Sequence, residues 1–183
     1  MDALDKFFDG SDAEGEEGGE GKGQSGADSE YQLRVGIAPD DPYIKARAEF
    51  VGMPTKAYSH GPKSKLDQEY VLFFFKITED LGSDEDTLIV GGEYSYFISL
   101  DSMTVEDWKY KREVSRMIDL IASMLDVSPE YLVHSDEGRE KLFNFRDTDG
   151  EALIGEQFII ETVPQKAGKS DNGWKQLEAT PAE

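Results

Sequence analysis

QEYVLFFFKIT, residues 68–78, is the stretch that decides the fold. Every second residue from 71 to 77 is apolar, and the residues between them are of mixed character. The two alternating sets are Val71, Phe73, Phe75, Ile77 and Tyr70, Leu72, Phe74, Lys76. Because successive side chains of a β-strand point to opposite faces, this pattern predicts a long strand with one face in the core.

The same period of two appears on both sides of this stretch. In YIKARAEFV, residues 43–51, the alternating apolar residues from Ile44 to Phe50 predict a half-buried strand. An acidic turn then leads to two short apolar runs, TLIV (87–90) and YSYFISL (94–100), which Gly91-Gly92 separates. Strand patterns return in EQFIIETV (156–163) and GWKQLEA (173–179).

A helical pattern interrupts the strands. Its apolar residues follow i, i+3, i+4, i+7, i+10, i+11 spacing and are Val114, Met117, Ile118, Ile121, Met124 and Leu125. This spacing predicts an amphipathic helix. Ser128-Pro129-Glu130 is typical of the cap and first turn of a second short helix, and residues 139–145 favour a further helical or irregular stretch.

The predicted order is strand, loop, strand, strand, helix, strand, loop, strand. This order resembles the oligonucleotide/oligosaccharide-binding (OB) barrel, whose second and third strands and whose loops after strands one and four bind ligands. We therefore expect a mainly β domain, an OB-like five-stranded barrel with a helix between strands three and four. A ferredoxin-like sheet and a plain β-sandwich remain alternatives.

Residues 1–30 differ in composition from the rest, because they carry ten acidic residues and two lysines. Low hydrophobicity with high net charge predicts disorder, so we expect a disordered acidic tail at 1–30 and an OB-like nucleic-acid-binding domain at 31–183. Within the tail, Leu4, Phe7 and Phe8 have helical i, i+3, i+4 spacing. We predict that they dock onto a partner protein, and a frayed N-terminal turn is the alternative.

The chain has a formal net charge of −20, yet two windows in it contain no acidic residue. The windows are residues 50–66 and 162–170, and their basic residues are Lys56, His60, Lys63, Lys65, Lys166 and Lys169. Both lie at the predicted binding loops. Charge repulsion is screened over about 10 Å at 0.1 M salt, so the position of the charges counts more than their sum. An anionic ligand is therefore predicted at these loops.

Binding of single-stranded nucleic acid requires cations for the phosphates and flat side chains on which the bases stack. The outward faces of the predicted strands and the two loops provide both kinds of residue. The candidate nucleic-acid-binding residues are Lys45, Arg47, Lys56, Tyr58, His60, Lys63, Lys65, Tyr70, Phe74, Lys76, Phe97, Lys166, Lys169 and Trp174. For each aromatic residue, ordinary packing is the alternative.

Motifs for catalysis, metals and cofactors are incomplete in this sequence. Cysteine is absent and only two histidines occur. AGKS at 167–170 lacks the first glycine of a phosphate-binding loop, and DTDG at 147–150 has phenylalanine in place of the first calcium ligand. We therefore predict a non-enzymatic protein without metal or cofactor. No apolar run is long enough to span a membrane, and no signal peptide is predicted.

The chain resembles small phage-encoded OB-fold proteins that bind single-stranded DNA or assist replication. The resemblance rests on YIKARAEFV (43–51), the Lys/Ser loop after it, YVLFFFKIT (70–78) and LIGEQFII (153–160), followed by a Lys/Gly loop and a short last strand. It implies a role in phage-type replication or recombination in the host cytoplasm, with single-stranded DNA and replication proteins as partners. Such proteins commonly carry their acidic tail at the C-terminus, whereas here it is N-terminal.

Two other functions fit the same sequence. One is a protein-interaction or virion-assembly component, which the acidic balance and the methionines of the predicted helix favour because methionine surfaces adapt to different partners. The other is an acidic protein that imitates DNA. Only the first hypothesis predicts affinity for single strands that falls with salt.

Overall fold

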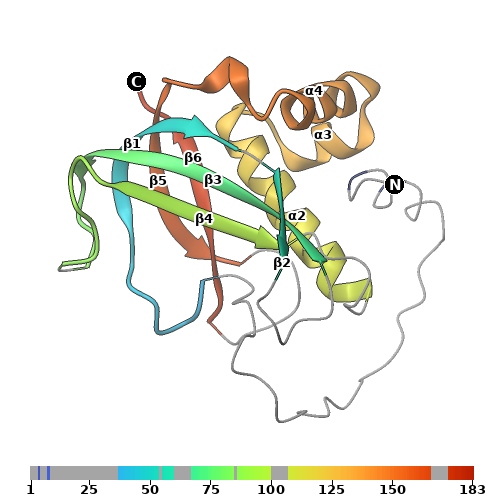
Figure 1. Cartoon of the computed structure of the whole chain (residues 1–183). Coiled ribbons are helices and arrows are strands. Elements are labelled where there is room, and N and C mark those ends of the chain that lie inside the picture. Colours follow the sequence, from blue (N-terminus) through green and yellow to red (C-terminus); the bar gives the residue numbers. More distant parts are fainter. Residues whose placement is uncertain are drawn as a thin grey trace, which may run out of the picture.

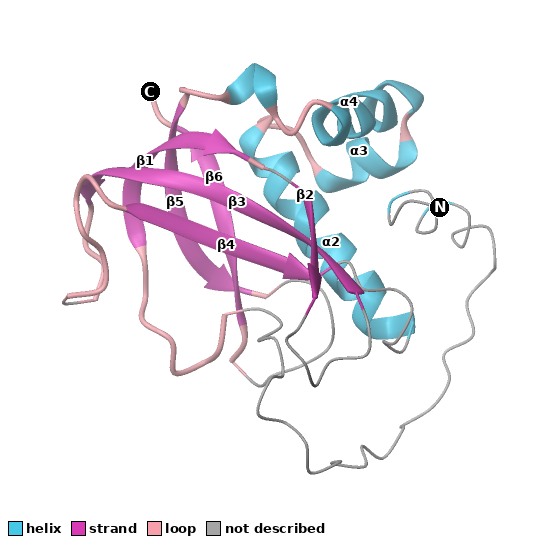
Figure 2. Cartoon of the chain, viewed as in Figure 1, coloured by secondary structure: helices cyan, strands magenta, loops and turns pink. Residues whose placement is uncertain are grey.

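The computed structural model describes residues 4, 8, 37–53, 55–59, 67–84, 86–99, 107–165 and 173–183. Figures 1 and 2 show a curved sheet with a helical layer on one of its sides. The strands are β1 Lys45–Gly52, β2 Thr55–Ser59, β3 Asp67–Asp80, β4 Glu93–Ser99, β5 Gln157–Pro164 and β6 Lys175–Pro181. The helices are α2 Asp107–Met124, α3 Pro129–His134, α4 Asp136–Asp147 and the short 3₁₀ helix η2 Glu151–Leu153.

All strand pairs in the sheet are antiparallel. β1 lies between β3 and β5, β4 pairs with the other side of β3, and β6 pairs with β5. β1 faces residues 74–80 of β3, and β2 faces residues 67–71, so the two follow each other along one side of β3. The prediction of a mainly β domain with helices between the third and fourth long strands is confirmed.

The inner face of the sheet is the one that the period of two predicted. The alternating residues of β1 and β3, from Ala46 to Phe50 and from Val71 to Ile77, are at most 2% exposed. They pack with Phe158 of β5 and with the predicted stripe of α2, of which Leu125 just past the helix is half-buried. α2 is buried on most sides because the sheet lies on one flank and α3 on another.

The sheet does not close in the part of the chain that the structure describes, so the predicted OB-like barrel is confirmed only as a mainly β sheet with helices between its third and fourth long strands. In the described part of the chain, β2, β4 and β6 each pair with a single strand, and α2 contacts β4 and β6. On the β6 side, the backbone N–H of Ala179 donates to the Ser123 hydroxyl of α2 at 3.1 Å. On the β4 side, Arg116 of α2 donates from Nε to the Tyr96 hydroxyl at 3.0 Å. Side chains of α2 thus form hydrogen bonds with both of these strands.

The two predicted caps explain where the short helices begin. Ser128 precedes α3, and its hydroxyl accepts the N–H of Tyr131 at 3.2 Å, while Pro129 occupies the first turn. Ser135 ends α3 and caps α4 by accepting the N–H of Gly138 at 2.9 Å. A side chain at Gly138 would lie 2.0 Å from the Tyr131 carbonyl oxygen, so glycine permits this close approach of α3 and α4.

The structure resolves two local features. Residues 87–90, the first of the two short apolar runs, form the turn before β4, in which Gly92 N–H donates to the Ile89 carbonyl at 2.8 Å. Residues 55–59, for which a loop and a loose β-ribbon were both open, form β2. Of the predicted N-terminal tail, only Leu4 and Phe8 are described; both are helical, and Leu4 is 1% exposed.

Candidate functional site

The outer face of β3 and β4 carries the aromatic residues that the sequence singled out. In the strand register, Leu72 lies opposite Phe97 and Phe74 lies opposite Ser95. Leu72, Phe74 and Phe97 are half-buried, whereas Ser95 is exposed. Opposite and diagonal residues on one face of an antiparallel pair are close enough to touch. These three side chains therefore form one apolar and aromatic patch, here called the β3–β4 patch.

The described cations of this face lie next to carboxylates. Lys45 Nζ is 3.3 Å from Glu161 Oε2, and Arg47 Nε is 3.4 Å from Glu79 Oε2. Lys76 is exposed, and its strand neighbours on the two sides are Glu49 and Glu93. The β1 and β3 part of the face therefore has mixed charge, where the sequence had indicated a positive track.

Glu161 of β5 is held by two residues from the start of β1. The Tyr43 hydroxyl donates to Glu161 Oε1, and Lys45 is paired with Oε2 of the same carboxylate. The hydrogen bond to Glu161 raises the pKa of Tyr43 to about 12, with burial contributing in the same direction. The same bond, followed by the contact with Lys45, lowers the pKa of Glu161. The carboxylate is therefore ionised at neutral pH and fixed in place.

The remaining predicted residues divide into two groups. Backbone pairing places Lys56 opposite Tyr70 and Tyr58 opposite Gln68. Trp174 is half-buried before β6, and its carbonyl accepts the N–H of Gln165 at 2.9 Å. Phe7, His60, Lys63, Lys65, Lys166 and Lys169 lie outside the described residues.

The described strands show where the two acid-free windows leave the sheet. In Figure 1, β2 and β5 both end toward the lower side of the view, where β3 and β6 begin. The segments that link β2 to β3 and β5 to β6 contain five of the six basic residues of the windows. Both connections therefore depart from the same side of the sheet.

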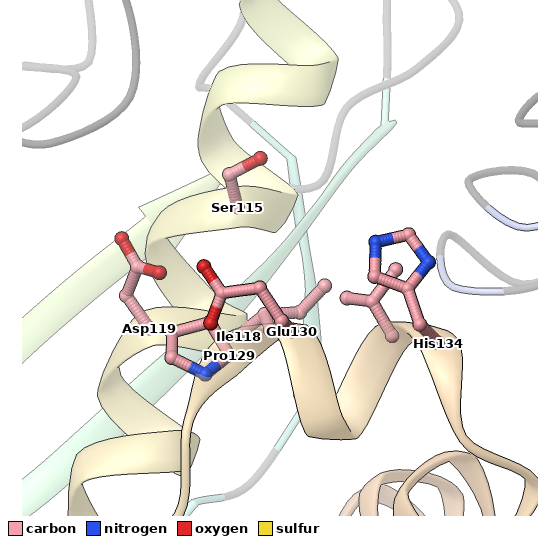
Figure 3. Close-up of a pocket in the computed structure, with 7 residues that line it drawn as sticks. Ser115, Ile118, Asp119, Pro129, Glu130 and His134 are labelled. Atoms are coloured by element: carbon pink, nitrogen blue, oxygen red, sulfur yellow. The ribbon is translucent and has the colours of Figure 1, made fainter.

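A separate hollow of about 150 Å³ lies between α2 and α3 (Figure 3). Ser115, Asp119 and His134 line it, which are residue types found in hydrolytic sites. In Figure 3 the Asp119 carboxylate and the His134 ring lie toward opposite ends of the hollow, and the Ser115 hydroxyl points toward neither. Asp119 instead accepts a hydrogen bond from Gln176 Nε2 at 3.3 Å. This arrangement does not orient a nucleophile and a base toward each other.

A cluster of aromatic rings and guanidinium groups at α4 was not predicted from the sequence. The Phe8 ring lies 5.5 Å from the Phe143 ring, between centroids. Arg139 Cζ is 5.1 Å from the Phe8 ring, and Arg146 Cζ is 4.6 Å from the Phe143 ring. The spacing of Leu4, Phe7 and Phe8 predicted docking onto a partner protein, whereas Leu4 and Phe8 pack within this chain.

Comparison with known proteins identifies no relative. No family, curated protein or solved structure matches this chain. Among the described residues, no group of three or more His, Asp or Glu side chains is placed to hold a metal ion. In the same residues, no helix is both long and apolar enough to cross a membrane.

Proposed function

We propose that the protein binds single-stranded DNA without catalysis, through the β3–β4 patch and the two acid-free windows. The observation that carries this proposal is the patch itself. Phe74 and Phe97 are only half-buried and lie on the face of the sheet opposite the core. Aromatic side chains on such a face stack with bases regardless of sequence, and each stacked base contributes about 1–3 kcal/mol.

The strand pairing supports the same proposal. β1 pairs with β3 and β5, β3 pairs with β4, and β5 pairs with β6. An OB-like domain has this arrangement before its edges close, and its ligands lie across the strands that correspond to β3 and β4. We infer that this is an OB-like sheet in which α2 separates the edges.

The charge distribution predicts how the phosphates are bound. Lys45 and Arg47 are paired with Glu161 and Glu79, so they are poor candidates for phosphate contacts. We assign those contacts to the lysines of the two windows, which have no acidic neighbour in sequence. The windows hold five lysines, and the salt dependence of binding scales with the number of phosphates neutralised, so we expect the affinity to fall as the salt concentration rises. From the resemblance in sequence we infer a role in phage-type replication or recombination.

The test is fluorescence anisotropy of a labelled strand of about 30 nucleotides, compared with the matching duplex at two salt concentrations. We expect the single strand to bind more tightly, and Phe74→Ala to weaken binding by about tenfold or more, which corresponds to loss of one stacked base. Tyr131→Ala is the matched control, because Tyr131 is a half-buried aromatic residue on α3, away from the sheet. Equal effects of the two substitutions would contradict the assignment to the patch.

A second candidate function is a protein-interaction or virion-assembly component, and one observation favours it. Ile89 and Val90 are 78% and 59% exposed in the turn before β4. Backbone bonds fix this turn, since Gly91 N–H donates to the Ile77 carbonyl and Ile77 N–H donates to the Gly92 carbonyl, both at 2.8 Å. A fixed, exposed apolar pair is typical of a protein contact. This function predicts no binding of either form of DNA in the same experiment.

A further inference from the structure

The N-terminal segment contacts the helical layer through two residues on one face. Leu4 and Phe8 are both helical, and residues four apart lie on the same side of a helix. Leu4 is 1% exposed and belongs to the hydrophobic core, and Phe8 packs partly buried against it.

The surface that receives Phe8 is built from residues of α3 and α4. The centroid of the Phe8 ring is 5.1 Å from Arg139 Cζ and 5.5 Å from the centroid of the Phe143 ring. Arg146 Cζ lies 4.6 Å from the centroid of the Phe143 ring. The two aromatic rings are thus in contact with each other, and each of them has one guanidinium group over it, which is favourable.

Both arginines are held by bonds that do not involve the N-terminal segment. Arg139 Nε donates to the Val133 carbonyl of α3 at 2.6 Å. Arg146 Nε donates to Asp147 Oδ1 at 2.7 Å. These bonds orient the two guanidinium groups from within residues 133–147. The site is therefore preorganised, which lowers the entropy that a ligand loses on binding.

The composition of the N-terminal segment complements this surface. Residues 1–9 carry Asp2, Asp5 and Asp9 against a single lysine, and the receiving surface presents two arginines. Residues 9–30, which follow, contain no Val, Ile, Leu, Met or aromatic residue. Between Phe8 and Tyr31 there is thus no large apolar side chain that could anchor the segment elsewhere.

We propose that Arg139, Phe143 and Arg146 form a recognition site for a short acidic helical peptide with leucine and phenylalanine four residues apart, and that this chain's own N-terminus is the resident ligand. Helix-in-groove recognition uses the same i, i+4 anchors. A tethered ligand has an effective concentration of about the millimolar range, so a second peptide binds only when the resident segment is released. The site is independent of the proposed DNA-binding face.

The test uses a labelled peptide of residues 1–12 and the full-length chain carrying Leu4→Asp and Phe8→Ala, whose own segment no longer fits. We expect saturable binding in fluorescence anisotropy, at least tenfold tighter than to the unaltered chain, where the site is filled. Phe143→Ala added to the receiving chain, or Leu4→Asp and Phe8→Ala in the peptide, should each weaken binding by tenfold or more.

Three results would overturn the proposal. Equal binding to the altered and unaltered chains would place the peptide elsewhere. Absence of binding to a receiving chain that still unfolds cooperatively would show that α4 has no separable site. Loss of folding in the Leu4→Asp, Phe8→Ala chain would show that the segment is a fixed part of the core and no ligand. If the single variant Phe8→Ala still folds, the loss of folding is due to the change at Leu4.

Discussion

Two arginine–carboxylate pairs in this protein share their chemistry and differ in their surroundings. Arg116 and Glu113 of α2 are 2.7 Å apart, and their side chains are 0% and 4% exposed. Arg47 of β1 and Glu79 of β3 are 3.4 Å apart, with side chains 38% and 58% exposed. The comparison shows how the surroundings of an ion pair change the effect of losing one partner on stability, because an unpaired charge is far more costly when it is buried away from water.

The buried pair is part of a network that joins the helix to both edges of the sheet. One nitrogen of Arg116 donates to both oxygens of Glu113, at 2.7 and 2.9 Å, and the guanidinium also donates to the Tyr96 hydroxyl. A backbone hydrogen bond from Leu177 of β6 reaches the same hydroxyl. Burial alone would lower the pKa of Arg116, but Tyr96 and Glu113 raise it above its ordinary value. The arginine therefore remains charged inside the protein.

The largest expected effect is that of Arg116→Leu, which leaves Glu113 buried without its partner. We expect the free energy of unfolding to fall by about 3–5 kcal/mol, the range found when one member of a buried pair is removed. Urea denaturation followed by circular dichroism measures it. Adding Glu113→Leu should restore much of the loss, because the orphaned charge is then gone. A loss below about 1 kcal/mol in the single variant would show that water reaches this network.

Two glycines, one at a buried and one at an exposed position, allow the same comparison for the packing of an added side chain. Gly150 and Gly155 have φ of 72° and 90°, so alanine strains the backbone at both. A Cβ at Gly150 would also lie 2.8 Å from Phe50 Cε1 and 2.9 Å from Phe145 Cζ, whereas at Gly155 nothing lies within 4 Å. We expect Gly150→Ala to reduce stability by about 1–3 kcal/mol more than Gly155→Ala, the usual range for overpacking. Equal losses in thermal or urea unfolding would mean that the rings move aside freely.

Much of the sheet and helix content was predictable because it depends on local periods. The alternation in β3 assigned Phe73 and Phe75 to the core, and the stripe of α2 assigned Met117 and Ile118; all four are at most 2% exposed. The cap at Ser128 was also predictable, since a hydroxyl before Pro-Glu satisfies a free N–H of the first turn. Each of these sequence patterns lies within a few residues of the strand, helix or cap that it predicts.

The open sheet and the charge pairing of its outer face were not predictable in the same way. A bond between α2 and β4 joins Arg116 to Tyr96, which are twenty residues apart in the sequence, and arginine is a residue type that is mostly exposed. The partners of Lys45 and Arg47 depend on strand register, which shifts between Arg47 and Ala48. The alternation of apolar and polar residues within a strand does not reveal a register shift, because the shift changes the pairing between two strands and leaves the period of each strand unchanged.

Tyr43 and Glu161 form an intermediate case, since they are partly exposed. Tyr43→Phe should reduce the free energy of unfolding by about 1 kcal/mol near neutral pH, the usual contribution of a hydrogen bond. The folded state lowers the pKa of Glu161, so this stability is present above the ordinary carboxyl value and is lost as pH falls. It raises the pKa of Tyr43 from 10.0 to about 12, so the same stability is full below pH 10 and is lost as pH rises through 12.

The difference between the unaltered chain and Tyr43→Phe should therefore be largest between about pH 5 and pH 10 and should shrink on both sides. Denaturation midpoints measured across pH give this difference directly. Lys45→Met serves as a second variant, because it removes the other partner of Glu161 and leaves the tyrosine in place. A difference that does not change with pH would show that the Tyr43 hydroxyl is not bonded to the carboxylate.

The smallest expected effect is that of Arg47→Met, the exposed counterpart of Arg116→Leu. Exposed pairs contribute about 0.2–1 kcal/mol, because water solvates each charge well when its partner is gone. We expect a loss at the lower end in urea denaturation, and a further decrease at high salt, where exposed charges are screened. Glu79→Gln should have the same small effect, since neither partner is left in a buried site. A loss comparable to that of Arg116→Leu would mean that the outer face of the sheet is shielded from water, and the β3–β4 patch beside it would then be unavailable to a ligand.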